Sequence, residues 1–215
     1  RNWYPGSILS ITFTPFLDTF PGREEKRHVG HHQCFRTRRS MNKVLVITGM
    51  PGAGKEEFVK VAQRKGYAVI RMGDVVRQEA ERQGVVMDDR GIGGFASSER
   101  HVHGPEIWAR RCLDILGTGP TVIDGSRSLM EMRAFRSALG EGTRLVAVHS
   151  SPASRFERLR KRNRSDAPRN IQEFEERDER ELGWGLGSLI AMADIMLVNE
   201  GTLEQFHALV EKELE

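Results

Sequence analysis

The sequence predicts a three-layer α/β fold, in which a central parallel sheet of about five strands lies between two layers of helices. Five short apolar runs, rich in β-branched residues, are separated by stretches with helical periodicity. Continuous apolar strands joined through helices are typical of a parallel sheet covered on both faces. A glycine-rich loop follows the first run and leads directly into the first helix. This order of strand, loop and helix predicts an anion-binding site at one edge of the sheet.

The expected elements follow one another through residues 41–215, which we interpret as one domain. The strands are expected at 44–47, 68–70, 121–123, 145–148 and 195–198. The helices are expected at 55–65, 74–83, 105–116 and 202–214, with a long charged helical stretch before the fifth strand. Pro105 is placed at the first position of its helix, where the fixed φ of proline is favourable.

Residues 1–40 differ from the rest of the chain, because they show no helical or strand periodicity. They hold seven Lys or Arg and three Asp or Glu, a balance of +4, whereas the remaining 175 residues hold 26 basic and 27 acidic side chains, a balance of −1. The domain therefore has no excess positive charge, and we expect no nucleic-acid partner. We interpret residues 1–40 as a disordered extension translated upstream of the functional domain. A native basic tail and a signal peptide are the alternatives.

The chain contains two cysteines, Cys34 and Cys112, and no apolar run of the roughly 18 residues that a membrane span needs. Few cysteines argue against a disulfide framework and are typical of a reducing compartment. We therefore expect a cytoplasmic protein without a membrane partner.

The loop after the first strand has the pattern of a P-loop: Gly49-Met50-Pro51-Gly52-Ala53-Gly54-Lys55. Glycines allow successive backbone N–H groups to point at phosphate oxygens, and the next helix presents its positive end to the same anion. Lys55 is placed to reach the β- and γ-phosphates. The sequence therefore predicts that this loop binds ATP, with Mg²⁺ as the second cofactor.

Glu56 departs from the usual pattern, in which a Ser or Thr hydroxyl after the lysine binds magnesium. One interpretation is that Glu56 turns outward in the first helical turn, where an acidic side chain is favoured by the helix dipole. The alternative is that its carboxylate holds magnesium directly or through water. We expect the first, because Mg²⁺ keeps most of its waters and Asp124, at the end of the third strand, can orient them.

Two segments after the second and third strands resemble motifs of adenylate kinase. Gly73-Asp74-Val75-Val76-Arg77 resembles its Gly-Asp-x-x-Arg motif, which implies that Arg77 binds the phosphate of the acceptor nucleotide. The stretch Asp124-Gly125-Ser126-Arg127 is similar to its Asp-Gly-x-x-Arg stretch, with the arginine displaced by one residue. The resemblance places Arg127 with the acceptor and leaves Asp124 facing the P-loop. Asp74 is the expected general base if the acceptor offers a hydroxyl group.

An arginine-rich stretch follows the fourth strand, where adenylate kinase has its mobile lid, and we place a lid at about 155–185. Arg158 and Arg162 are four residues apart and so share one helix face. We assign both to catalysis, because clustered guanidinium groups neutralise the oxygens of a transferring phosphoryl group. Arg177 and Arg180 resemble the returning arginines of the lid. The alternative is a charged surface helix whose Glu and Arg side chains pair along its face.

The segment 193–203 is similar to the last strand and loop of dephospho-coenzyme A kinase, which makes Asn199 a candidate contact of the adenine base. Taken together, residues 41–215 resemble an archaeal family of P-loop kinase-like proteins related to adenylate kinase and dephospho-coenzyme A kinase. The resemblance implies ATP and a small phosphorylated acceptor, without naming that acceptor.

We therefore expect an ATP-dependent phosphotransferase acting on a nucleoside monophosphate or a dephospho-coenzyme A type of acceptor. A regulatory or assembly ATPase without a small acceptor is the alternative. A GTPase is disfavoured, because the Asn-Lys-x-Asp guanine signature is absent after the last strand, where the chain reads Val198-Asn199-Glu200-Gly201.

The extension interpretation predicts that residues 1–40 can be removed without loss of stability. The thermal midpoint of the chain that starts at Met41 should lie within about 5 °C of the midpoint of the full chain. A shift of that size corresponds to a change of roughly 1 kcal/mol or more in the free energy of unfolding of a domain of this size. Differential scanning calorimetry of both chains measures this. A larger drop would show that the extension packs on the domain.

Overall fold

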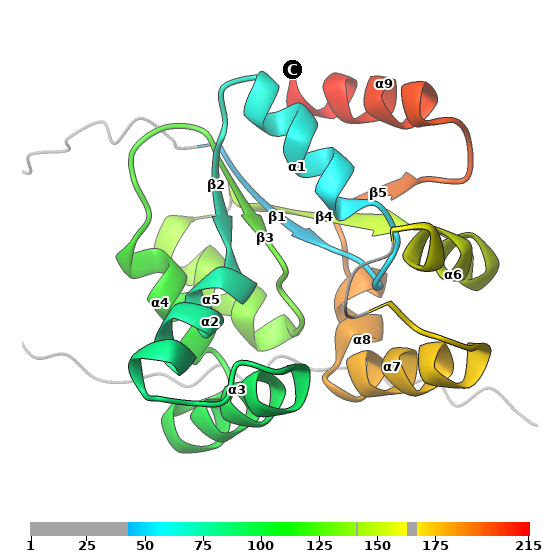
Figure 1. Ribbon diagram of the computed structural model, residues 1–215. Coiled ribbons are helices and arrows are strands. Elements are labelled where there is room, and N and C mark those ends of the chain that lie inside the picture. The colour runs from blue at the N-terminus through cyan, green and yellow to red at the C-terminus, as the bar shows by residue number, and fades with distance from the viewer. Residues whose placement is uncertain (1–42, 141, 163–166) are drawn as a thin grey trace, which may run out of the picture. The chain divides into compact units, whose positions relative to one another are not determined.

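The computed structural model describes residues 43–140, 142–162 and 167–215 (Figure 1). The interpretation of residues 1–40 as an extension lies outside these residues. Of the helices in the described part, none is both long enough and apolar enough to cross a membrane.

A five-stranded sheet, parallel throughout, forms the centre of the domain and confirms the predicted fold class. Its strands are β1 (Val44–Thr48), β2 (Ala68–Arg71), β3 (Thr121–Asp124), β4 (Arg144–His149) and β5 (Ile195–Val198). They lie in the order β2-β3-β1-β4-β5, so β1 is the central strand. The chain leaves β1 at the carboxyl edge of the sheet, between the ends of β3 and β4, which is where ligands bind in parallel α/β sheets.

The helices of the described residues cover both faces of this sheet (Figure 1). They are α1 (Lys55–Arg64), α2 (Met72–Arg82), α3 (Asp89–His103), α4 (Ile107–Asp114), α5 (Leu129–Leu139), α6 (Pro152–Lys161), α7 (Ile171–Gly183), α8 (Leu186–Ala191) and α9 (Leu203–Leu214). The predicted start of α4 at Pro105 is wrong by two residues. A turn closed by the Ile107 N–H and the Gly104 carbonyl, 3.1 Å apart, occupies the intervening positions.

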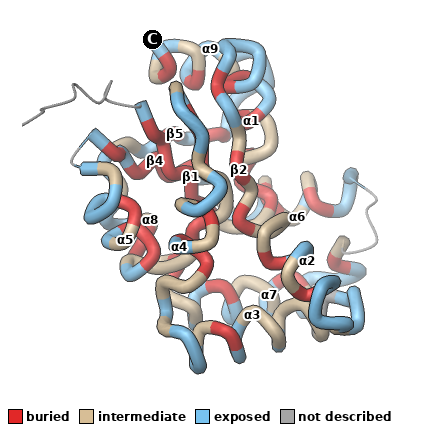
Figure 2. Tube along the Cα trace, turned by 90° about the vertical axis from the view of Figure 1, so that its left-hand side faces the viewer, coloured by how far each residue is buried: buried red, intermediate tan, exposed pale blue. Residues whose placement is uncertain are grey.

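Alternate residues of β1 supply two hydrophobic cores, one on each face of the sheet. Leu45 and Ile47 pack in the core beneath α1 and α9, whereas Val44 and Val46 pack in the core beneath α2, α4, α5 and α8. This alternation is the period of two that a strand imposes on its side chains. Buried segments accordingly run through the middle of the domain in Figure 2. A strand that is buried on both faces holds the loop at its end in a fixed position.

Helix α3 was not predicted, because glycines at 91, 93 and 94 give its sequence low helix propensity. Tertiary contacts hold it in place. The indole N–H of the fully buried Trp108 donates to the carbonyl of Ala96 at 3.2 Å, and its ring packs edge-on against Phe95. The Asp88 side chain caps the amino end of α3. These contacts place α3 against α4, beside the carboxyl edge of the sheet.

Helix α5 was also missed, although its amino end carries a recognisable signal. Ser128 and Glu131 form a capping box, in which each side chain accepts from the backbone N–H of the other residue. A Ser followed three residues later by Glu, before an apolar run, is the sequence signature of such a helix start.

Candidate functional site

The path of the P-loop depends on glycines that other elements approach closely. A Cβ atom at Gly49, where φ is +147°, would lie 2.3 Å from the carbonyl oxygen of Val148 on β4. A Cβ atom at Gly54, where φ is +114°, would lie 2.2 Å from the side-chain nitrogen of Asn199. Neither position has room for a side chain, and both backbone conformations are unfavourable for other residues. The glycines therefore allow β4 and the loop after β5 to pack directly against the backbone of the P-loop.

Lys55 begins α1, and its ammonium group lies over the loop. Its Nζ donates to the carbonyl oxygens of Gly49, at 2.5 Å, and Met50, at 3.3 Å. Burial lowers the pKa of the Lys55 ammonium, and the nearby carboxylate of Asp124 acts in the opposite direction. A partly desolvated cation at this point attracts a phosphate more strongly than an exposed one would.

Asp124 ends β3 at the level of Ile47 on β1 and faces the P-loop. Its Oδ1 is buried and has no hydrogen-bonding partner within the described residues. Burial raises the pKa of this carboxyl, while Lys55 and Arg71 act to lower it. An unpartnered oxygen beside a phosphate cradle suits the second coordination shell of Mg²⁺, which keeps several of its waters. The Asp124 carboxylate therefore fits the hydrated magnesium ion that we predict.

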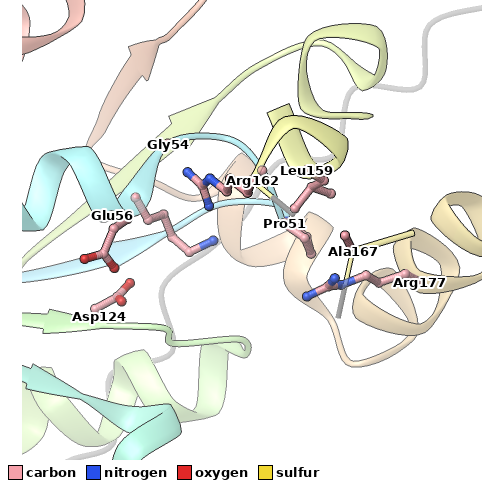
Figure 3. Close-up of a pocket in the computed structure, with 10 residues that line it drawn as sticks. Pro51, Gly54, Glu56, Asp124, Leu159, Arg162, Ala167 and Arg177 are labelled. Carbon is pink, nitrogen blue, oxygen red and sulfur yellow. The ribbon is translucent and has the colours of Figure 1, made fainter. Parts of the chain in front are cut away.

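Glu56 is partly exposed, and one oxygen of its carboxylate forms an ion pair. Its Oε1 lies 3.0 Å from the Nη2 of Arg71, at the end of β2. Figure 3 shows its carboxylate on the same side of the cavity as that of Asp124. The ion pair with Arg71 offsets the repulsion that a carboxylate would exert on a nearby phosphate.

The loop after β5 is joined to the P-loop and to α6. The Asn199 side chain donates to the Ala53 carbonyl at 2.8 Å. Arg158 donates to the Ser150 hydroxyl at 2.7 Å and to the Asn199 carbonyl at 2.8 Å. Arg158 therefore holds the loop after β5 in place, whereas Arg162 lines the cavity at the P-loop (Figure 3). The structure thus separates two arginines that we had assigned to one role.

Arg155 was not singled out by sequence reasoning, since nothing distinguishes it within its arginine-rich stretch. Its side chain is almost entirely buried. Its Nη1 donates to the Pro51 carbonyl at 3.2 Å and to the Asp178 carboxylate at 2.8 Å. The guanidinium carbon lies 4.8 Å from the ring centroid of Phe174. One buried cation therefore connects the P-loop, α6 and α7.

Three adjoining cavities follow one another along the carboxyl edge of the sheet. The P-loop cavity, of about 170 Å³, is lined by Lys55, Glu56, Asp124, Arg162 and Arg177, among others. The connecting cavity, of about 130 Å³, is lined by Lys55, Arg127, Arg177 and Glu181, among others. The arginine cavity, of about 660 Å³, lies between α2, α3 and α7. Arg177 lines all three, so they adjoin one another around its side chain.

The arginine cavity is named for its basic wall, which consists of Arg77, Arg100, Arg127, Arg177 and Arg180. Glu181 is the one carboxylate of its described lining. Each guanidinium presents several N–H donors in a fixed plane, a geometry that is complementary to carboxylate and phosphate groups. Arg77 also pairs with Asp74, whose carboxylate lines a neighbouring recess with Lys55 and Asp124.

Arg127 connects the loop after β3 to α7. Its Nε donates to the Glu181 carboxylate at 2.9 Å, and its guanidinium carbon lies 5.5 Å from the ring centroid of Trp184. Trp184 also lies in the wall of the arginine cavity.

Glu131 fixes two of the cavity arginines and was missed by sequence reasoning. Its fully buried Oε2 accepts from the Arg127 backbone N–H at 2.7 Å, the Ser126 hydroxyl at 3.2 Å and the Ser128 N–H at 3.3 Å. Its Oε1 accepts from the Nη2 of Arg100 at 3.1 Å. The capping-box signature could have located this residue, but not its contact with Arg100, which lies 31 positions away.

The fold and the loop geometry define a P-loop nucleotide-binding protein with a kinase-like fold. Residues 48–175 match the AAA domain family. UPF0200 protein Ta0179 of Thermoplasma acidophilum is 49% identical over 166 residues, covering 77% of this chain and 91% of its own length. UPF0200 protein MK0400 of Methanopyrus kandleri is 48% identical over 163 residues, covering 73% and 81%. The chain belongs to the UPF0200 family, which confirms the predicted resemblance to an archaeal P-loop kinase-like family.

Solved structures support the same fold at low sequence identity. TT1252 from Thermus thermophilus superimposes with a TM-score of 0.56 at 18% identity, covering 80% of this chain and 96% of its own. A shikimate kinase from Bacteroides thetaiotaomicron gives a TM-score of 0.56 at 16% identity, covering 80% and 97%. At such identities these similarities establish the fold alone.

The contrasting environments of Asp124 and Glu56 predict different effects of their removal. Asp124→Ala should lower kcat/KM by on the order of 100-fold, because metal-assisted charge stabilisation contributes several kcal/mol to a transition state. Glu56→Ala should change it by less than about fivefold, since a partly exposed ion pair contributes up to about 1 kcal/mol. The measurement is ADP formation as a function of Mg²⁺ concentration. A large rise in the Mg²⁺ required by Glu56→Ala alone would make Glu56 a metal-site residue.

Proposed function

We propose that this protein transfers a phosphoryl group from ATP to a small phosphorylated, nucleotide-like acceptor. The observation that carries the proposal is the position of Arg177, which lines the P-loop cavity, the connecting cavity and the arginine cavity. A donor phosphate at the P-loop and an acceptor anion at the arginine wall would then meet at one guanidinium group. A protein that only hydrolyses ATP has no need of a second cavity with a basic wall beside the first.

On the donor side, the amides of residues 49–54, the start of α1 and Lys55 bind the ATP phosphates. Asp124 would hold Mg²⁺ through water, and the ion would supply positive charge that stabilises the phosphates of ATP. Asn199 is the candidate contact of the adenine base, and its side chain also donates to the Ala53 carbonyl of the P-loop. Glu56, paired with Arg71, shapes the edge of the donor site.

On the acceptor side, Arg77 and Arg127 bind the anionic group of the acceptor. If the attacking atom is a phosphate oxygen, no general base is needed. If it is a hydroxyl oxygen, Asp74 is the general base, because it lines the recess that Lys55 and Asp124 share. Asp74 would first have to part from Arg77, and acceptor binding to Arg77 offers a route to that.

Around the transferring group, Arg162 and Arg177 neutralise the charge that develops on the phosphoryl oxygens. Arg158 contributes indirectly, because its hydrogen bonds hold the loop after β5 in place. The chain's own residues thus act by positioning and electrostatic stabilisation, which is what phosphoryl transfer requires of a protein.

The proposal is tested by incubating the full chain with ATP, Mg²⁺ and each of a panel of nucleoside monophosphates and dephospho-coenzyme A. We expect ADP formation that depends on one acceptor, with the phosphorylated acceptor as the second product. ADP formation at one rate with or without every acceptor would instead support the regulatory or assembly ATPase.

Lys55 and Arg77 serve different substrates in this proposal, and single substitutions should separate them. Lys55→Ala should abolish turnover and weaken ATP binding. Arg77→Ala should raise the KM for the acceptor by on the order of tenfold, about 1.4 kcal/mol, while the Kd for ATP stays nearly constant. Arg82→Ala is the matched control, since Arg82 is also on α2 and pairs with an acidic residue three positions earlier. Equal weakening of ATP binding by Lys55→Ala and Arg77→Ala would contradict the acceptor assignment.

A further inference from the structure

One edge of the central sheet is left open by the described part of the chain. β5 pairs with β4 on one side, and no described strand pairs with its other side. Figure 1 shows β5 at the end of the sheet, beside α9. The outer N–H and C=O groups of an edge strand can pair with another chain, and natural proteins commonly protect them with a charged residue or a proline. The strand Ile195-Met196-Leu197-Val198 contains neither.

Exposed apolar side chains gather along this edge. Of the twelve large apolar side chains that are exposed in the described residues, five lie within 192–209: Met192, Met196, Val198, Leu203 and Leu209. The strand at the opposite edge, β2, contributes none of the twelve. A single exposed leucine is normal, whereas a group of apolar side chains along an unpaired edge is typical of an interaction surface. We call β5 and the outer side of α9 the β5–α9 surface.

A recess of about 610 Å³ lies on this surface. It is lined by Val198 of β5 and by Gln205, Ala208, Leu209 and Lys212 of α9, among others. The four α9 residues are three or four positions apart along the helix, or adjacent, so they form one helix face. Ala208 is small, and the distance between two packed helices depends on the side chains at their contact. A second helix can therefore approach α9 closely at this point.

Charges on α9 are arranged symmetrically about Ala208. Glu204 lies four residues before it and Lys212 four residues after it, so all three are on one side of the helix. Both charged side chains are exposed, and neither forms an ion pair within the described residues. A second α9 that ran antiparallel and crossed at Ala208 would place each Lys212 beside the partner's Glu204. A charge pattern that is complementary to itself fits a second copy of this chain.

We propose that two copies of this chain associate through the β5–α9 surface about a two-fold axis. The two α9 helices pack antiparallel and cross at Ala208, which buries Leu209 of each copy at the contact. Two ion pairs between Lys212 and Glu204 of opposite copies close the ends of the helix pair. The β5 strands face one another across the axis, so that each open edge is covered by the other chain.

The association also reaches the loop after β5. Glu200 and Gly201 of this loop line the recess, and Asn199, which precedes them, donates to the Ala53 carbonyl at 2.8 Å. Glu200 accepts from the Ser154 hydroxyl at 2.6 Å, at the start of α6. The second copy therefore contacts the loop that joins the P-loop to α6.

Sedimentation equilibrium of the full chain measures the association, and we expect the mass of two chains. Leu209→Glu should raise the dissociation constant of the dimer by at least about 100-fold, because a two-fold contact contains the substitution twice. Leu209 is exposed, so the circular dichroism spectrum should not change. Ile115→Glu is the matched control, since Ile115 is also an exposed apolar side chain but lies at the end of α4. It should leave the dissociation constant unchanged.

A charge exchange tests the antiparallel arrangement. Lys212→Glu and Glu204→Lys each bring like charges together in a dimer of identical chains, and each should raise the dissociation constant by about tenfold. An equal mixture of the two variants should form a mixed dimer as tight as the unmodified one, because both ion pairs form again. A variant that failed to fold could not give this recovery.

A full chain that stays monomeric would overturn the proposal, whether another segment of the chain or another protein occupies the surface. A dimer that Leu209→Glu does not weaken would place the contact elsewhere and overturn it as well. Failure of the mixed variants to recover the affinity would overturn the antiparallel arrangement.

Discussion

The buried guanidinium of Arg155 is the interaction on which the arrangement of the site depends. It joins the Pro51 carbonyl of the P-loop to Asp178 of α7, and α6 carries it between them. Removing one partner of a buried ion pair leaves an uncompensated charge, which typically costs about 3–5 kcal/mol. Because Asp178 neighbours Arg177, this contact also sets where Arg177 lies relative to the phosphate cradle. The P-loop cavity and the start of the arginine cavity are thus positioned by one side chain.

Helix α7 shows how a charged sequence can support two interpretations. A surface helix whose acids and bases pair along its own face would use Asp178 and Glu181 locally. Instead, these two acids form ion pairs with Arg155 and Arg127, which belong to other elements. Arg177 and Arg180, offset by one position, line the arginine cavity. A spacing of three residues places the members of each pair on the same side of the helix. Asp178 and Glu181 anchor the helix, and Glu181 also lines the arginine cavity beside Arg177 and Arg180.

The P-loop, the five strands and the position of Asp124 could be predicted from sequence, because each depends on local pattern: glycine spacing, apolar runs and the end of a strand. Helix α3 could not, since its glycines lower its propensity and the packing of Trp108 that stabilises it comes from α4. Arg155, Arg158 and Glu131 show a second limit. Their residue types were visible, but Arg155 contacts Pro51 at 104 positions, Arg158 contacts Ser150 at 8 positions and Glu131 contacts Arg100 at 31 positions, and only the fold brings these residues together. The sequence therefore indicated which residue types gather at the site better than it indicated which partner each arginine contacts.

The contact between Arg100 and Glu131 also limits the conformational entropy of the Arg100 side chain. Glu131 is fully buried, and Arg100 is the cation that balances it. Movement of Arg100 away from Glu131 would leave this buried carboxylate without its countercharge, so the Arg100 side chain is held in place. A long side chain that is already immobile loses little rotamer freedom when a ligand arrives, a loss that otherwise costs about 0.5–1.5 kcal/mol per side chain. The arginine wall is consequently pre-organised at Arg100. This side chain cannot move to follow an anion that lies elsewhere in the cavity.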